Sequence, residues 1–133
     1  METINHEYFV SLEVAKLLKQ AGFDWACRKI HYKYPGDAGN WSLEDNYMNH
    51  HRILEVDYCL LAPTLDVAQR WLREVKGYNV LVSHNFELNT HGWWILQDND
   101  MLYCNYETQF DTYEEAQEAG IKKILEIILE KGE

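Results

Sequence analysis

The six histidines are the residues of this 133-residue chain that could most readily bind a metal or move a proton near neutral pH. His84 lies in an alternating segment, with Glu87 three residues later and His91 beyond, so a metal-dependent enzyme using His84, His91 and an acid is one hypothesis. No third ligand stands at a recognisable spacing, which favours a hydrogen-bonded core position for His84. The adjacent His50 and His51 would point to opposite faces of an extended chain and would not share one metal ion. We therefore expect no metal and no cofactor.

The cysteines and serines give no sign of a catalytic nucleophile. Cys27, Cys59 and Cys104 are odd in number, far apart and without a C-x-x-C pair, so we expect unpaired and mostly buried thiols. No serine stands in a Gly-x-Ser-x-Gly elbow, and the seven glycines form no phosphate-binding loop. These patterns favour a non-catalytic protein.

One segment, residues 25–34 (WACRKIHYKY), combines cations with aromatic rings. Cations bind phosphates and rings stack on bases, so this strand is a candidate for binding single-stranded nucleic acid. The candidate contacts are Trp25, Arg28, Lys29, His31 and Lys33. The alternative is an edge strand that lysines protect from aggregation. Twelve Lys and Arg against twenty-two Asp and Glu give a net charge of −10, which opposes non-specific attraction to nucleic acid and favours the alternative.

Composition indicates one packed domain over residues 1–133. The chain is 47% hydrophobic and 14% aromatic, with only two prolines, which excludes a disordered protein. No apolar run is long enough to span a membrane, and the start METINHEYF lacks the pattern of a signal peptide. We expect a soluble, cytoplasmic protein.

Three similar motifs predict the starts of three helices. They are SLEVAK, TLDVAQ and TYEEAQ, beginning at residues 11, 64 and 112. Each opens with a Ser or Thr that can cap a helix, followed by an acid in the first turn. The first two helices end at Gly22 and Gly77, where we expect positive φ angles. The same order of helix, glycine and aromatic residue suggests a half-repeat, and the sequence leaves open whether it is a true duplication.

The remaining segments alternate with a period of two and predict strands. They are residues 25–34, 54–60, 80–88, 92–97 and 101–106, whereas residues 36–50 are expected to form a long surface loop. The predicted order is α-β-β-α-β-β-β-α. We expect an α+β fold in which one mostly antiparallel sheet of about five strands is covered on one face by three helices.

The succession HYKYPGD, LLAPTLDVAQRWLREVKGYNV and FDTYEEAQEAGIKKILEII resembles a set of uncharacterised small proteins of phages, prophages and mobile elements of Bacteroides-like bacteria. The matching features are Gly22-Phe23, Tyr34-Pro35, Ala62-Pro63-Thr64 and Glu114-Glu115-Ala116. The resemblance covers most of the chain except the 36–50 loop. It implies a mobile-element context and carries no assigned activity.

The stretch GWWILQ is the part of the sequence closest to function. Adjacent strand residues point to opposite faces, so one of Trp93 and Trp94 should face the helices and the other should not. The turn at Asp98-Asn99-Asp100 decides whether Tyr103 or Cys104 joins Trp94, and the sequence leaves both registers open. We expect Trp93, Trp94 and Tyr103 to mark a partner-binding face, for another protein or for a second copy of the chain in a homodimer.

Overall fold

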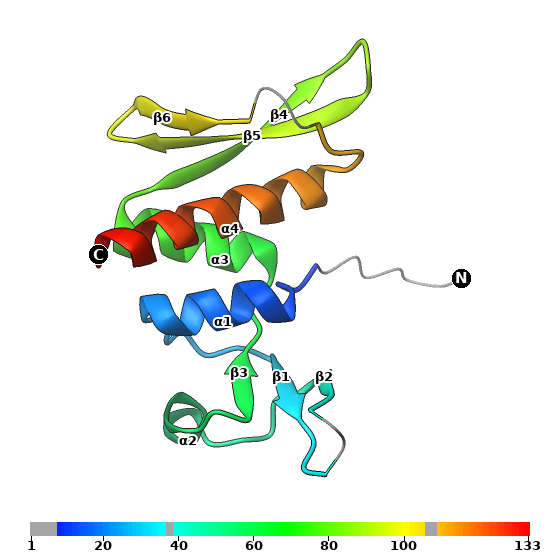
Figure 1. Cartoon of the computed structure of the whole chain (residues 1–133), viewed down its shortest axis with the longest axis vertical. Coiled ribbons are helices and arrows are strands. Elements are labelled where there is room, and N and C mark those ends of the chain that lie inside the picture. Colours follow the sequence, from blue (N-terminus) through cyan, green and yellow to red (C-terminus); the bar gives the residue numbers. More distant parts are fainter. Residues whose placement is uncertain (1–7, 37–38, 106–108) are drawn as a thin grey trace.

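The computed structural model describes residues 8–36, 39–105 and 109–133, and it shows two sheets rather than one. Each sheet has three antiparallel strands, in the orders β2-β1-β3 and β4-β5-β6. The sheets lie at opposite ends of an elongated molecule, and helices α1, α3 and α4 lie between them (Figure 1). The expectation of a single five-stranded sheet with three helices was therefore wrong, although the α+β character of the fold is as expected.

Four α-helices occur in the described part of the chain: α1 (Leu12–Ala21), α2 (His50–Glu55), α3 (Leu65–Trp71), which continues into the π-helical segment η1 (Leu72–Lys76), and α4 (Tyr113–Lys131). The strands are β1 (Lys29–Lys33), β2 (Trp41–Asp45), β3 (Cys59–Leu61), β4 (Asn79–Asn85), β5 (Thr90–Gln97) and β6 (Asp100–Cys104). Residue 106, which the sequence placed at the end of the last strand, lies outside the described residues.

The predicted helix starts are confirmed by their capping hydrogen bonds. The side-chain oxygens of Ser11, Thr64 and Thr112 each accept a bond from the backbone N–H three residues later, over 3.2, 3.3 and 3.1 Å. These bonds satisfy donors that have no partner within a helix. Gly22 and Gly77 end their helices with φ angles of 98° and 80°, as predicted. The aromatic residue that follows each glycine is buried in the core.

The first sheet corrects two predictions. Strand β2 lies within the segment expected to be a loop, and it pairs with β1 from Lys29↔Asp45 to Lys33↔Trp41. Residues 54 and 55, expected to begin a strand, instead end helix α2 (His50–Glu55), which the Asn49 side chain caps by accepting bonds from the backbone N–H groups of His51 and Arg52. The expected strand over residues 54–60 is shortened to β3 (Cys59–Leu61), which pairs with β1.

The second sheet is a meander in which β5 is central. Strand β4 was expected to reach residue 88 but ends at Asn85, and residues 86–89 form a turn in which Phe86 is 85% exposed. Asp98 and Asn99 have φ angles of 51° and 69° and make a two-residue turn between β5 and β6. Positive φ at both central residues matches the right-handed twist of the strands and closes a tight hairpin.

Helix α4 is buried on two sides in the middle of the molecule. Eight of its residues are buried, on a stripe too broad for a helix that covers only one surface. It packs against β4 and β5 on one side and against α1 on the other. Gly120 lies against the sheet so closely that a Cβ atom there would come within 2.8 Å of Val80 Cγ1 and 2.9 Å of Trp93 Cβ. The helix is thus a central layer of the fold.

The two halves of the chain share a helix followed by an antiparallel hairpin, but their sheets are connected differently. In the first half the third strand, β3, pairs with the first strand of the hairpin. In the second half the third strand, β6, pairs with the second strand of the hairpin. The capping motifs repeat and the topology does not, so the structure gives no support for a simple duplication.

Candidate functional site

The candidate site is the outer face of the β4-β5-β6 sheet, the face turned away from α4. Cross-strand pairs project to the same side of a sheet, and the register pairs Val80 with Ile95 and Val82 with Trp93. Val80 and Ile95 are fully buried on the helix side. The opposite side is therefore the outer face, formed by Asn79, Leu81, Ser83, Asn85, Thr90, Gly92, Trp94, Leu96, Met101 and Cys104. All four described helices lie on the other side of this sheet (Figure 1).

The prediction for the two adjacent tryptophans is confirmed. Trp93 is 8% exposed and packs over Gly120, whereas Trp94 on the outer face is 40% exposed. A bulge in β6 sets which of its side chains lie on the outer face. Leu96 pairs with Met101 and Ile95 pairs with Tyr103, so Leu102 is the extra residue of the bulge. Of the expected partner-binding residues, only Trp94 therefore lies on the outer face, and Trp93 and Tyr103 face the core.

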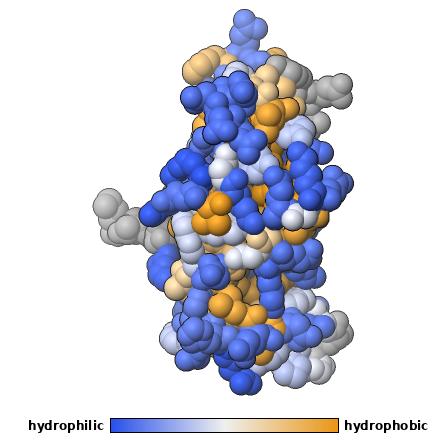
Figure 2. Space-filling model, turned by 90° about the vertical axis from the view of Figure 1, so that its left-hand side faces the viewer, coloured by the Kyte–Doolittle hydropathy of each residue, from blue (hydrophilic) through white to orange (hydrophobic). Residues whose placement is uncertain are grey.

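Among the described residues, the outer face has an apolar centre and carries no Asp, Glu, Lys, Arg or His. Leu81 is 45% exposed and Met101 is 46% exposed, and both flank Trp94. The amide and hydroxyl members, Asn79, Ser83, Asn85 and Thr90, have uncharged side chains. Elsewhere the surface is rich in charge: from the side shown in Figure 2 it is largely hydrophilic, with apolar residues in separate patches. An uncharged apolar sheet face is unusual in a chain of net charge −10.

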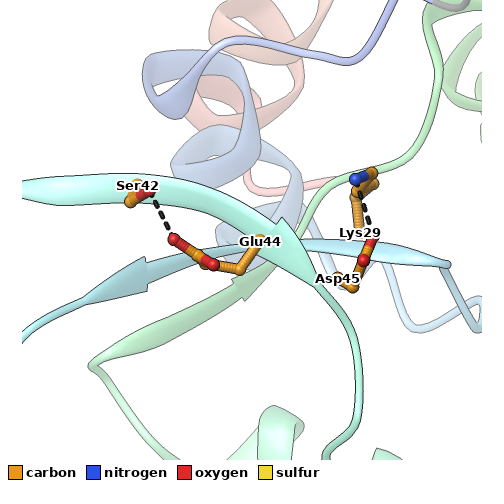
Figure 3. A network of polar contacts seen from close by, with 4 residues as sticks. All are labelled: Lys29, Ser42, Glu44 and Asp45. Carbon is orange, nitrogen blue, oxygen red and sulfur yellow. Dashed lines mark hydrogen bonds and ion pairs between the residues drawn. The ribbon is translucent and has the colours of Figure 1, made fainter.

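The segment proposed for nucleic acid, residues 25–34, does not present its cations together. Lys29 Nζ lies 2.6 Å from Asp45 Oδ1 on the neighbouring strand, and that lysine holds the pKa of Asp45 below its ordinary value (Figure 3). The adjacent residues of β2 add a second acidic group, since Ser42 Oγ donates a 2.6 Å bond to Glu44 (Figure 3). His31 is buried and its Nε2 lies 2.9 Å from the Val10 carbonyl oxygen.

Two further members of that segment contact aromatic or cationic groups of the protein itself. The Arg28 guanidinium lies 5.9 Å from the centre of the Phe9 ring, and Trp25 lies under Arg70 at 5.6 Å. Lys33 is exposed at the end of the strand. Strand β1 lies between β2 and β3, so the alternative of an edge strand was wrong. Arg28, Lys29 and His31 contact a ring, an acid and a carbonyl oxygen of the protein itself.

His84 and His91 are brought together as direct cross-strand partners. Their rings stack with centres 4.6 Å apart and planes at 15°. His84 is exposed, contrary to the expectation of a core histidine, and its Nε2 lies 3.0 Å from Asn89 Oδ1. Parallel stacked rings direct their nitrogen lone pairs side by side rather than toward one point. Within residues 8–36, 39–105 and 109–133, no group of three or more His, Cys, Asp or Glu side chains could hold a metal ion.

The cysteines are unpaired, as predicted, but they differ in burial. Cys59 is fully buried, whereas Cys27 and Cys104 are partly exposed. Burial raises the pKa of the Cys27 thiol to about 12 and also raises the pKa of Cys59. Thiolates are the reactive form, so both thiols are poor nucleophiles near neutral pH.

Comparison of the chain with protein families, with curated proteins and with solved structures finds no match. Among the helices described, none is both long and apolar enough to cross a bilayer. The function must therefore be argued from the geometry of the chain itself.

Proposed function

We propose that the protein is a non-catalytic binding or accessory protein of a phage or mobile element, which engages a protein partner or itself through the outer face of the β4-β5-β6 sheet. The mobile-element context and the cytoplasm as the working compartment rest on the sequence resemblance. The binding role rests on the outer face.

One observation carries the proposal: Trp94 stands half-exposed at the middle of an uncharged apolar face. Large aromatic side chains are enriched at the centres of protein interfaces, where charged residues are depleted. Trp93, which is adjacent in sequence, is already used by the core. Trp93 therefore stabilises the fold, and Trp94 is the residue whose apolar surface a partner would cover.

The experiment places a photo-activatable amino acid at Ser83, an uncharged position on the outer face, and illuminates cells that express the variant. The matched control carries the same amino acid at Lys123, which is exposed on α4 away from the outer face. We expect covalent protein adducts from position 83 that are absent or much weaker from position 123. Equal adducts from both positions, or none from position 83, would refute the binding role.

A substitution pair gives the second readout. Trp93→Ser should unfold the protein because it removes a buried side chain that packs on α4. Trp94→Ser should leave the fold intact and abolish the adducts from position 83. A folded Trp94→Ser variant that still gives those adducts would show that the partner does not use this face.

A further inference from the structure

We propose that a groove at the N-terminal ends of α3 and α4 binds an arginine-bearing segment of a partner protein, in which the arginine is next to an apolar residue. The groove consists of two adjoining hollows of about 320 and 450 Å³, and Tyr8, Leu65 and Glu114 line both. None of its lining residues belongs to the outer face, so the inference goes beyond the proposed function and adds a second binding surface.

Segments that are far apart in the sequence meet at the groove. The backbone N–H of Leu65 donates a 2.8 Å bond to the Tyr8 carbonyl oxygen, which ties the N-terminal segment to the start of α3. Phe110 and His91 exchange two backbone bonds of 2.7 Å, which hold the chain just before α4. Backbone hydrogen bonds therefore fix the walls of the groove, and a partner need not order them on binding.

The larger hollow is lined mainly by apolar side chains. Leu65 is buried, and Phe9, Phe110 and Ala119 are partly buried. Their remaining apolar surface faces solvent in the free protein, and an apolar side chain of a partner would remove it from water. The larger hollow therefore supplies a place for the apolar member of the pair.

The smaller hollow combines two carboxylates with two exposed aromatic rings. Asp66 and Glu114 line it together with Tyr8 and Tyr113, which are 48% and 44% exposed. The buried Gln117 side chain donates a 2.9 Å bond to Asp66 Oδ1, which orients that carboxylate. A guanidinium binds carboxylates through paired N–H groups and also stacks on rings, whereas an ammonium acts as a point charge. The combination of acids and rings therefore favours arginine.

Carboxylates outnumber bases around the groove. The dipole of α4 stabilises an acid in its first turn, such as Glu114, but its effect is lost by Glu118. Both glutamates line the larger hollow, and like charges one turn apart destabilise a helix. Lys122 is the one base among the described lining residues, and its Nζ lies 2.9 Å from Glu13 Oε1. Arg28 lies over a lining ring but lines neither hollow. A cationic segment is thus the complementary partner.

The test titrates short peptides into the isotope-labelled full chain and follows the backbone amide signals by NMR. All peptides share one glycine-serine frame with a central pair, in which arginine, lysine, citrulline or glutamate stands next to leucine, phenylalanine or serine. Citrulline keeps the shape of arginine without its charge. We expect arginine next to leucine or phenylalanine to bind tightest and to shift amides that line the groove, and citrulline to weaken binding at least about tenfold.

Two of the possible results would overturn the inference. If no peptide shifts the amides of the groove, the groove is not a binding site. If arginine next to serine binds as tightly as arginine next to leucine, the peptides respond only to the net charge of −10 and not to the paired hollows.

A matched pair of double variants locates the charge that matters. Glu114→Gln with Glu118→Gln changes the groove, whereas Glu126→Gln with Glu130→Gln changes two exposed acids of α4 that do not line it. Both doubles remove two charges four residues apart on the same helix. The first should weaken the arginine–leucine peptide at least about tenfold, and the second by less than about twofold. Equal weakening by both doubles would exclude the groove.

Trp94→Ser separates this site from the outer face. It should bind the arginine–leucine peptide as the wild type does, and loss of binding would place the peptide on the outer face and overturn the groove. Peptide binding in the groove without adducts from position 83 would refute the outer face alone, so the two proposals fail separately.

Discussion

Gly120 is the position where the fit between helix and sheet is tightest, and its replacement by alanine tests the two-layer packing of α4. A Cβ atom at this position would lie 2.8 Å from Val80 Cγ1, 2.9 Å from Trp93 Cβ and 3.2 Å from Trp93 Cγ. Favourable carbon–carbon contacts lie at about 3.5–4.0 Å, so helix and sheet would have to separate by several tenths of an ångström or more. The Trp93 Cβ atom is fixed to the backbone and cannot rotate away.

Two effects of opposite sign decide the result. Alanine in a helix interior is more favourable than glycine by about 1 kcal/mol. Overpacking of a tight core costs about 1–3 kcal/mol, and two contacts under 3.0 Å place this site at the upper end of that range. We therefore expect Gly120→Ala to lower the free energy of unfolding by about 2 kcal/mol.

The assay is urea unfolding followed by tryptophan fluorescence. The control is the double variant Val80→Ala with Gly120→Ala, compared with Val80→Ala alone. Removing Val80 Cγ1 relieves the closest contact, so the alanine at 120 should cost less in that background. A Gly120→Ala protein as stable as wild type, or more stable, would show that α4 does not approach the sheet as closely as described.

Three further predictions follow from local geometry and charge. Gly22→Ala and Gly77→Ala should each lower the free energy of unfolding by about 1 kcal/mol, because both sites have a positive φ angle and no atom lies within 4 Å of the added Cβ. Asparagine at either site should cost less, since it tolerates positive φ better than alanine. Unchanged urea midpoints would contradict this. At pH 8 native Cys27 should react far more slowly with a thiol reagent than in the denatured chain, because burial raises its pKa to about 12; rapid labelling at Cys27 in the native state would refute it. Asp45→Asn should be less stable than wild type at pH 6 and equal to it in acid. The hydrogen bond from Lys29 lowers the pKa of Asp45, and the stability that this adds is lost as pH falls through the folded-state pKa. A stability difference that persists in acid would exclude this cause.

Features that depend on neighbouring residues could be predicted from the sequence. The caps at Ser11, Thr64 and Thr112, and the left-handed glycines that end two helices, each require only a few adjacent side chains to be in place. Alternation along GWWILQ likewise required one tryptophan to be buried and the other exposed. These features follow from backbone geometry, which is the same in any fold that contains the element.

Features that depend on which segments meet could not be predicted in the same way. Leu54, Val56, Tyr58 and Leu60 alternate like a strand, but the Asn49 cap starts a six-residue helix across the first of them. Asn49 is a sequence signal for a helix start, whereas the alternating apolar residues predict a strand. Strand β2 was not predicted, because the turn-forming residues around it indicate a loop. Its extended conformation comes from backbone hydrogen bonds to β1, which the local sequence does not reveal.

The single-sheet prediction failed for a related reason. The apolar stripe of α4 includes both Gly120 and Ile121, on neighbouring faces of the helix, and both are buried. A helix that covers one sheet needs a narrower stripe. The breadth of the stripe therefore contained the information that α4 lies between two layers, but it does not say what the second layer is. Here the second layer is α1, which in turn contacts β3 of the other sheet.

The bulge at Leu102 determines which β6 side chains lie on the outer face. With the two-residue turn at Asp98 and Asn99 and no bulge, Tyr103 would pair with Trp94 and point outward. The extra residue instead sends Tyr103 into the core beside Ile95 and brings Cys104 opposite Trp94. No sequence rule distinguishes these outcomes, because both leave apolar residues on each face. The choice falls to packing, since the tyrosine ring gains contacts with the core that the smaller cysteine could not make. The outer face that results has the small Cys104 side chain beside Trp94 and no tyrosine hydroxyl, so the indole ring of Trp94 is its largest apolar feature.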